Sequence, residues 1–171
     1  MKKSVFAVLC LCIAAALLGG CSYDREAAKQ PVSEGQAVGM PNPFIDCQTM
    51  EKAEEIAGFN MSSPVFDDLT ERSYQAVKGQ MIQVFNRGDG APGDGGVLVR
   101  KAKGSGDISG DYNTYPVNDT FEINGIKITA RGTEEGYVTV IWEDGGYAYA
   151  MDMDEICMPK ELLEVYIPMI R

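Results

Sequence analysis

The sequence predicts an α+β fold, with an N-terminal helix, a mainly antiparallel β-meander of about six strands and a C-terminal helix. Three observations support this fold class. Apolar and polar residues alternate through the centre of the chain, glycine-rich turns separate consecutive alternating segments, and a short amphipathic segment lies at each end of this region. Consecutive hairpins favour an antiparallel sheet, because parallel strands need long crossover connections.

The first amphipathic segment covers residues 50–57 and is predicted to be a helix. Thr49 is a candidate N-cap, and Gly58 lies where a glycine after the last helical residue would end the helix. The positions expected to share its apolar face are Met50, Ala53, Ile56 and Ala57. Such a short helix is marginal alone, so we expect it to pack on the sheet.

The candidate strands follow this helix. They are the segments 74–77, 80–86, 96–103, 120–123, 126–131, 137–142 and 147–153. The dipeptide Asn124-Gly125 supplies the two positive-φ positions of a type I′ hairpin, and the segment 143–146, EDGG, serves the next hairpin. Small residues, Ala148 and Ala150, occupy one face of the last strand, so we expect a helix to pack over them.

The C-terminal segment MPKELLEVYIPMIR is predicted to be the second helix. Pro159 suits the first turn of a helix, and Pro168 is expected to end or kink it. The expected apolar face consists of Leu162, Val165, Tyr166 and Met169.

The N-terminus carries the pattern of a secretory signal peptide. Two lysines precede an apolar run over residues 4–18, which is too short to span a bilayer comfortably. The sequence LGGC that ends at Cys21 resembles the bacterial lipobox, in which the cysteine is acylated and becomes the first residue. We therefore predict a lipoprotein with a signal peptide over residues 1–20, lipid attachment (diacylglycerol and palmitate) at Cys21 and a location on the outer face of the cell membrane. An ordinary cleaved signal is the alternative.

Residues 21–43 are polar and contain three prolines without a sustained period, so they are predicted to form a flexible tether. Residues 44–171 then form a single α+β domain. The formal net charge of the whole chain is −10, and it becomes −12 when Lys2 and Lys3 leave with the signal peptide. This charge excludes nucleic acid as a partner, because a phosphate backbone requires clustered cations. The membrane is then a partner through the lipid alone.

Two cysteines, Cys47 and Cys157, remain after the signal peptide is removed and Cys21 is acylated. In an extracytoplasmic protein such a pair can form a disulfide, which would join the two ends of the domain. Two free thiols are the alternative, and the sequence leaves both open.

The residue types exclude some catalytic chemistry. The chain contains no histidine, so a Ser-His-Asp or Cys-His centre is not available. Acidic pairs such as Asp67-Asp68 and Glu143-Asp144 are frequent, but a glycosidase needs two carboxylates that face each other across a cleft. We therefore expect a protein that is not an enzyme and has no cofactor.

The stretch GSGDISGDYN, residues 104–113, is a weak candidate for calcium binding. Oxygen-bearing side chains at alternate positions resemble the first half of an EF-hand loop, and they belong to Asp107, Ser109, Asp111 and Asn113. The pattern fails at Tyr112, where the EF-hand has glycine, and at Asn118, where it has a bidentate carboxylate. A long turn is the simpler interpretation of this stretch.

Three segments occur in a fixed order before the final predicted helix. They are PNPFIDCQTMEKAEEIAGF, VRKAKGSGDISGDYN and IWEDGGYAYAM. Together they resemble a group of uncharacterised extracytoplasmic proteins and lipoproteins of Gram-positive anaerobes. These proteins are similar to the domain of unknown function at the outer, C-terminal end of some anti-sigma factors. The resemblance extends from about Pro41 to the C-terminus. It implies a surface domain and transfers no catalytic residues.

These observations predict a lipid-anchored extracytoplasmic domain that binds or senses a protein or cell-wall ligand without catalysis. An envelope hydrolase that uses paired carboxylates is one alternative. A structural component of the cell wall is another.

Overall fold

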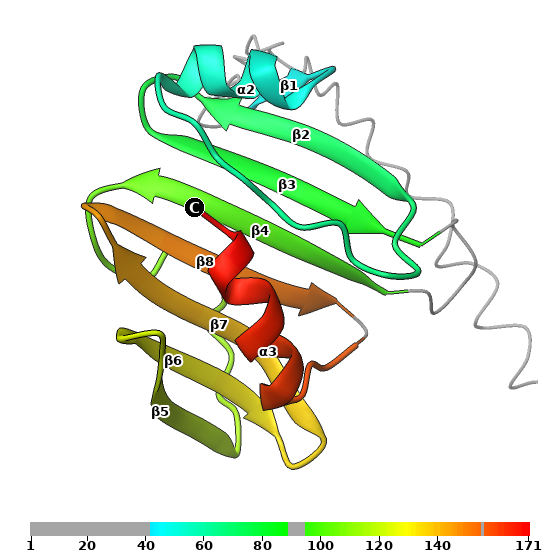
Figure 1. Cartoon of the computed structure of the whole chain (residues 1–171). Helices are drawn as coiled ribbons and strands as arrows, with labels where there is room; N and C mark the ends of the chain where they lie inside the picture. Colours follow the sequence, from blue (N-terminus) through cyan, green and yellow to red (C-terminus); the bar gives the residue numbers. More distant parts are fainter. Residues whose placement is uncertain (1–41, 89–94, 155) are drawn as a thin grey trace, which may run out of the picture. The chain divides into compact units, whose positions relative to one another are not determined.

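Eight antiparallel strands form one sheet in the order β1-β2-β3-β4-β8-β7-β6-β5 (Figure 1). The computed structural model describes residues 42–88, 95–154 and 156–171. The strands are β1 (Ile45–Cys47), β2 (Glu71–Val77), β3 (Met81–Arg87), β4 (Gly96–Lys103), β5 (Val117–Ile123), β6 (Ile126–Thr133), β7 (Gly136–Asp144) and β8 (Tyr147–Asp154). The described part of the chain is therefore mainly β, and it keeps two short helices in agreement with the α+β prediction at the coarse level.

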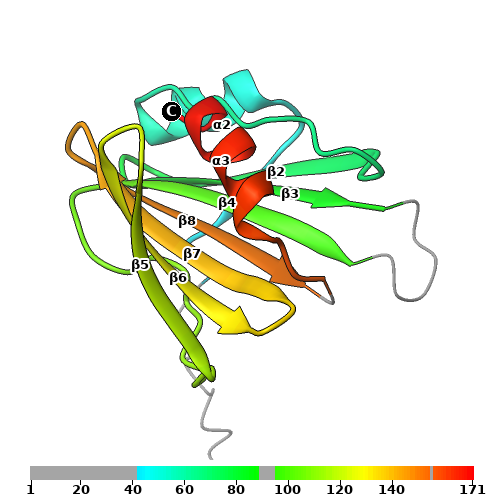
Figure 2. The ribbon, with the colours of Figure 1, turned by 60° about the horizontal axis from the view of Figure 1, so that its bottom comes forward.

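The helices α2 (Met50–Ala57) and α3 (Lys160–Tyr166) lie on the same face of the sheet (Figure 2). The predicted ends of α2 are confirmed. The backbone N–H of Lys52 donates a 3.3 Å hydrogen bond to the hydroxyl of Thr49, and Gly58 adopts the left-handed conformation with φ of 73°. The buried residues of α2 are Ala53 and Ala57, as predicted.

The hydrophobic core lies between this face of the sheet and the helices. Residues from the segment between α2 and β2, including Phe59, Met61 and Phe66, complete it. The largest fully buried apolar side chains are Ile82, Ile128, Met151, Leu163 and Ile167. The core therefore uses the bulky residues of the strands, which alternate with the polar residues of the opposite face.

The prediction that a helix packs over the small residues of β8 is wrong. Ala148 and Ala150 are buried, yet the hydrophobic core cluster instead contains Tyr149, Met151 and Met153 from this strand. Successive side chains of a strand point to opposite faces, so the two alanines belong to the face without helices.

The predicted face of the C-terminal helix is also wrong. Leu162, Val165 and Met169 are 43–50% exposed, while Leu163, Ile167 and Ile170 are buried. Of the predicted face, only Tyr166 packs against the core. Both sets satisfy helical spacing in the apolar run LLEVYIPMI, so the sequence alone did not decide between them. The structure confirms the end of the helix, since α3 passes at Tyr166 into the 3₁₀ turn η1 (Ile167–Met169) that contains Pro168.

The connectivity differs from a single meander of about six strands that follows a helix. The short strand β1 precedes α2, and the eight strands form two antiparallel runs, β1 to β4 and β5 to β8. The runs join where β4 pairs with β8, and residues 104–116 carry the chain from β4 to β5 at the far edge of the sheet. This pairing connects segments far apart in sequence, so local alternation could not predict it.

The predicted hairpin turns are confirmed. Asn124 and Gly125 have φ of 51° and 81° between β5 and β6, as a type I′ turn requires. Gly145 and Gly146 have φ of 58° and 85° between β7 and β8. These turns fix the register of the second run of strands.

Cys47 and Cys157 are both free thiols, so of the two alternatives that the sequence leaves open the structure has the free thiols and not the disulfide. Cys47 lies on the edge strand β1, whereas Cys157 lies beside Gly136 at the start of β7. Five strand-to-strand steps separate β1 from β7, which amounts to about 24 Å across the sheet. A disulfide requires Cα atoms within about 7 Å of each other. Burial raises the pKa of the Cys47 thiol.

Candidate functional site

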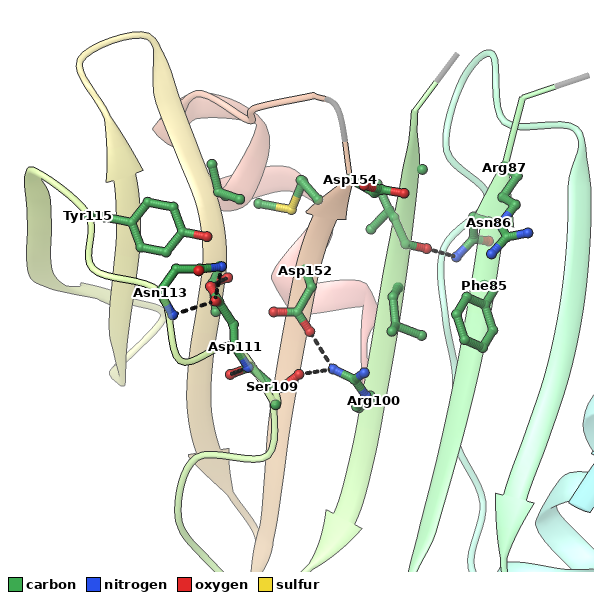
Figure 3. Close-up of a pocket in the computed structure, with 17 residues that line it drawn as sticks. Phe85, Asn86, Arg87, Arg100, Ser109, Asp111, Asn113, Tyr115, Asp152 and Asp154 are labelled. Carbon is green, nitrogen blue, oxygen red and sulfur yellow. Dashed lines mark hydrogen bonds and ion pairs between the residues drawn. The ribbon is translucent and has the colours of Figure 1, made fainter. Parts of the chain in front are cut away.

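A cavity of about 530 Å³ lies on the face of the sheet without helices (Figure 3). Strands β3, β4, β7 and β8 line it on one side, and the β4–β5 loop, residues 104–116, lines it on the other. This loop contains the stretch GSGDISGDYN. The candidate site therefore combines the stretch GSGDISGDYN, which the sequence indicates as a possible site, with strands β3, β4, β7 and β8, whose proximity to this stretch the sequence does not predict.

The β4–β5 loop is ordered by a series of short-range hydrogen bonds. One carboxylate oxygen of Asp107 accepts from the backbone N–H and the hydroxyl of Ser109, at 2.9 and 2.6 Å. The Ser109 hydroxyl accepts from the N–H of Asp111 at 3.1 Å, and Asp111 accepts from the N–H and the amide of Asn113 at 2.9 and 2.8 Å. Three of the four alternating side chains, those of Asp107, Ser109 and Asp111, thus turn the chain by bonding to the backbone two residues ahead.

Two arginines attach this loop to the sheet. Arg100 on β4 donates to the carbonyl oxygen of Ser109, and Arg131 on β6 donates to the carbonyl oxygen of Asp111 at 3.2 Å. Arg131 also forms an ion pair with Asp107. Because guanidinium groups donate several hydrogen bonds in fixed directions, the two arginines define the height of the loop above the sheet.

The calcium hypothesis receives no support from this arrangement. The structure does bring Asp107, Ser109, Asp111 and Asn113 together in one loop. The oxygens of Asp107, Ser109 and Asp111, however, accept hydrogen bonds from the loop itself, from Arg131 and from Thr139. Within the described ranges, no group of three or more acidic or cysteine side chains is arranged to hold a metal ion.

Asp152 on β8 is the most perturbed carboxylate of the site. It forms an ion pair with Arg100 at 2.6 Å through Oδ2, and its side chain is only 19% exposed. Its other oxygen, Oδ1, is buried and has no hydrogen-bond partner among the described residues. Burial raises the pKa of Asp152 to about 6, although the positive charge of Arg100 and the nearby hydroxyl of Thr139, which donates to Asp111, act in the opposite direction.

Asp111 lies across the cavity from Asp152 (Figure 3). The hydroxyl of Thr139 on β7 donates to Asp111 at 2.7 Å. Burial alone would raise the pKa of Asp111, but the hydrogen bonds from Thr139, Asn113 and Tyr115 outweigh this effect and lower it. The site therefore contains two carboxylates with pKa values displaced in opposite directions.

A row of polar side chains continues from Asp152 across the sheet. Arg100 also donates to Gln83 at 3.1 Å, Gln83 donates to Gln75, and Gln75 donates to Asp46 on β1 at 2.6 Å. This row holds Arg100 in place from the side opposite to Asp152. The guanidinium is thereby fixed before any ligand arrives.

Sequence reasoning missed Arg100, Arg131, Thr139 and Asp152 as residues of the site. A signal for Arg100 and Asp152 was present, since each is a charged residue within a strand of alternating apolar residues. Their approach to the loop, however, depends on the pairing of β4 with β8. The predicted lipid attachment site, Cys21, lies outside the described residues.

Comparisons with models of protein families, with curated protein sequences and with solved structures found no match. Neither helix in the described part of the chain is long and apolar enough to span a membrane.

Proposed function

We propose that the chain is an extracytoplasmic domain, anchored to the outer face of the cell membrane through lipid on Cys21, that binds its ligand in the cavity under the β4–β5 loop. The observation that carries this proposal is the cavity of about 530 Å³ with a buried carboxylate oxygen, Asp152 Oδ1, that lacks a partner in the described structure. Concave sites with a few convergent polar groups are typical of ligand binding. The resemblance to uncharacterised extracytoplasmic proteins of Gram-positive anaerobes agrees with this location.

The rigid wall of the cavity supports a binding role. Ion pairs and backbone hydrogen bonds from Arg100 and Arg131 hold the loop over the sheet. A site that is formed in advance spends little free energy on ordering when a ligand binds. The ligand is then a cell-wall fragment or an extracytoplasmic protein segment that inserts into the cavity.

Filling the cavity is expected to abolish binding. Leu98 on β4 lines the cavity and is half-buried, so the larger side chain of Leu98→Trp would occupy the space of a ligand. We expect soluble peptidoglycan fragments to bind the full chain in a non-ionic detergent and not to bind this variant, as measured by isothermal titration calorimetry. Thr120→Trp on the exposed edge strand β5 is the matched control and should bind as the unmodified chain does.

Two outcomes would count against the proposed site. Equal binding by Leu98→Trp and Thr120→Trp would place the ligand elsewhere. Sedimentation of both variants with insoluble cell wall, without binding of soluble fragments, would favour a structural wall component.

The lipid anchor has its own test. Replacing Cys21 with serine removes the thiol that is acylated, so we expect the variant to appear in the medium while the unmodified chain stays with the membrane fraction. Fractionation followed by immunoblotting measures this distribution. A Cys47→Ser variant is the control, and it should remain with the membrane. Retention of the Cys21→Ser variant would contradict the proposal.

A second candidate function is an envelope hydrolase. It is favoured by one observation, namely that Asp152 has a pKa raised to about 6 while the pKa of Asp111 is lowered, as a general acid and a base would require. The hydrogen bonds argue against it, because Asp152 is paired with Arg100 and both oxygens of Asp111 already accept donors. Release of reducing ends from purified peptidoglycan, lost in both Asp111→Asn and Asp152→Asn, would establish the hydrolase instead.

A further inference from the structure

The cavity has an apolar end and an acidic end. Phe85 on β3, Leu98 on β4 and Asp152 on β8 are direct cross-strand neighbours, since Phe85 pairs with Leu98 and Leu98 pairs with Asp152. Directly paired residues of neighbouring strands point to the same face of the sheet, and all three of these residues line the cavity; Phe85 and Asp152 are labelled in Figure 3. The row covers about 10 Å from the Cα of Phe85 to that of Asp152. An extended aliphatic chain can lie along it and end at the carboxylate.

One of the two carboxylate oxygens at the acidic end makes no hydrogen bond among the described residues. Asp152 Oδ2 faces Arg100, while Oδ1 turns away from Arg100 toward the side of Asp111 (Figure 3). Oδ1 is buried and has no partner among the described residues. A buried carboxylate oxygen without a donor is costly, so a ligand that supplies N–H groups at this point gains free energy.

The charges around the cavity favour a cation at this position. Its lining includes the carboxylates of Asp111, Asp152 and Asp154 and the guanidinium groups of Arg87 and Arg100. Arg100 is engaged by Asp152, Ser109 and Gln83. Arg87 is exposed and lies over the ring of Phe85, with 5.4 Å between its Cζ and the ring centroid, at the opposite end of the row from Asp152. The charged residues of the lining therefore carry one more negative than positive charge, three carboxylates against two guanidinium groups.

We propose that the cavity binds a protonated primary amine on an alkyl chain, with the ammonium donating to Asp152 Oδ1 and the chain lying over Leu98 and Phe85. This inference rests on the proposed binding function and specifies its ligand class. A lysine side chain of a peptide and a free diamine share this chemistry. An ammonium carries a positive charge and three N–H donors, whereas a hydroxyl is neutral and has one donor. The ionised carboxylate of Asp152 should therefore bind an ammonium more strongly than a hydroxyl.

The test uses three probes of similar length with the full chain in a non-ionic detergent at about pH 7.5. They are 1,5-diaminopentane, Nα-acetyl-lysine methylamide and the neutral 1,5-pentanediol. By isothermal titration calorimetry, we expect at least one of the two amines to bind at least about tenfold more tightly than the diol. The lysine derivative should be the tighter of the two if the source is a peptide, and the diamine if it is a free amine.

Removal of the acceptor charge should abolish the preference. In Asp152→Asn we expect the affinity for the amines to fall at least about tenfold, to the level of the diol. Glu122→Gln, an exposed acid-to-amide change on the edge strand β5, is the matched control and should bind the amines as the unmodified chain does.

A pH titration of the unmodified chain provides a test that needs no variant. Asp152 must be ionised to accept from an ammonium, and its pKa is raised to about 6. The charged groups that act on it are Arg100 from β4 and Asp107 and Asp111 from the loop. The affinity for 1,5-diaminopentane should therefore rise about tenfold between about pH 5 and pH 7 and change little up to about pH 8.

The outcomes separate this inference from the proposed function. Equal binding of the diol and the amines, or an affinity that does not change with pH, would overturn the amine inference. If peptidoglycan fragments still bind and Leu98→Trp still abolishes their binding, the proposed function stands without it. If neither amines nor fragments bind, both are wrong.

Discussion

Replacing Arg100 with methionine is expected to destabilise the folded protein by about 3–5 kcal/mol at about pH 8. Arg100 is 18% exposed in its side chain and is the ion-pair partner of Asp152, which is 19% exposed. Methionine keeps much of the volume of the side chain but leaves a buried carboxylate without its cation. It also removes the hydrogen bonds to Ser109 and Gln83.

The size of this loss should depend on pH. In the unmodified protein, burial raises the pKa of Asp152 from 3.8 to about 6, so the folded state binds this proton more tightly than the unfolded state does. Ionisation of Asp152 therefore lowers stability as the pH rises from about 4 to about 6. Without Arg100 the pKa rises further, and the loss continues at higher pH. We expect the difference between the two proteins to be smaller near pH 5, where the lost hydrogen bonds to Ser109 and Gln83 are its main cause, and largest near pH 8.

Urea unfolding of the full chain, followed by fluorescence, measures both effects. The single tryptophan, Trp142, is 4% exposed and stacks on Tyr149, so its emission should report loss of the core. Arg87→Met is the matched control. Arg87 is exposed at the end of β3, and its replacement should change stability by less than about 1 kcal/mol at every pH. A loss for Arg100→Met that is the same at pH 5 and pH 8 would show that Asp152 is not its cause.

The parts of the fold that the sequence predicts correctly are local. Thr49, Gly58 and the dipeptide Asn124-Gly125 act through the backbone of their immediate neighbours, and the structure confirms each of them. The burial of Ala53 and Ala57 follows in the same way from helical spacing. In these cases the residues that determine the local structure lie within a few positions of the residue that predicts it.

The parts that the sequence does not predict depend on distant contacts. The run LLEVYIPMI offers two apolar faces, and only the packing of Leu163 and Ile167 against the sheet distinguishes them. The free state of Cys47 and Cys157 follows from the order of the strands, which sets the two residues on β1 and beside β7. No local pattern contains that order.

The candidate site depends both on local sequence signals and on contacts between residues far apart in the sequence. The loop residues Asp107 and Asp111 were recognisable as a series of oxygen-bearing positions, although their oxygens serve the loop and not a metal ion. The residues that convert the loop into the wall of a cavity, Arg100 and Asp152, come from strands paired across the middle of the sheet. The stretch GSGDISGDYN is therefore a long turn, as predicted. It contributes to the candidate site because it forms one wall of the cavity that Arg100 and Asp152 line on the other side.

Replacing Gly132 with alanine is the second change with a large expected effect. Gly132 lies at a bulge in β6, where the register with β7 shifts between Arg131 and Gly132. A Cβ atom at this position would lie 2.2 Å from the carbonyl oxygen of Gly136 and 2.6 Å from the Cα of Tyr137. Both are backbone atoms, so no side-chain rotation relieves the overlap, and β7 would have to move.

Movement of β7 would disturb the attachment of the C-terminal region. Tyr137 and Met158 exchange two backbone hydrogen bonds of 3.0 and 2.9 Å, and Met158 belongs to the hydrophobic core. We therefore expect Gly132→Ala to lower the free energy of unfolding by about 3 kcal/mol, measured by urea unfolding with Trp142 fluorescence.

Gly145→Ala separates this steric effect from the conformational preference of glycine. Gly145 has φ of 58° in the turn between β7 and β8, and a Cβ atom there meets nothing within 4 Å. The left-handed conformation alone costs alanine about 1 kcal/mol, so this variant should lose about a third as much stability as Gly132→Ala. Equal losses in the two variants would mean that β7 yields easily at the bulge, and that the contact between Tyr137 and Met158 does not fix its position.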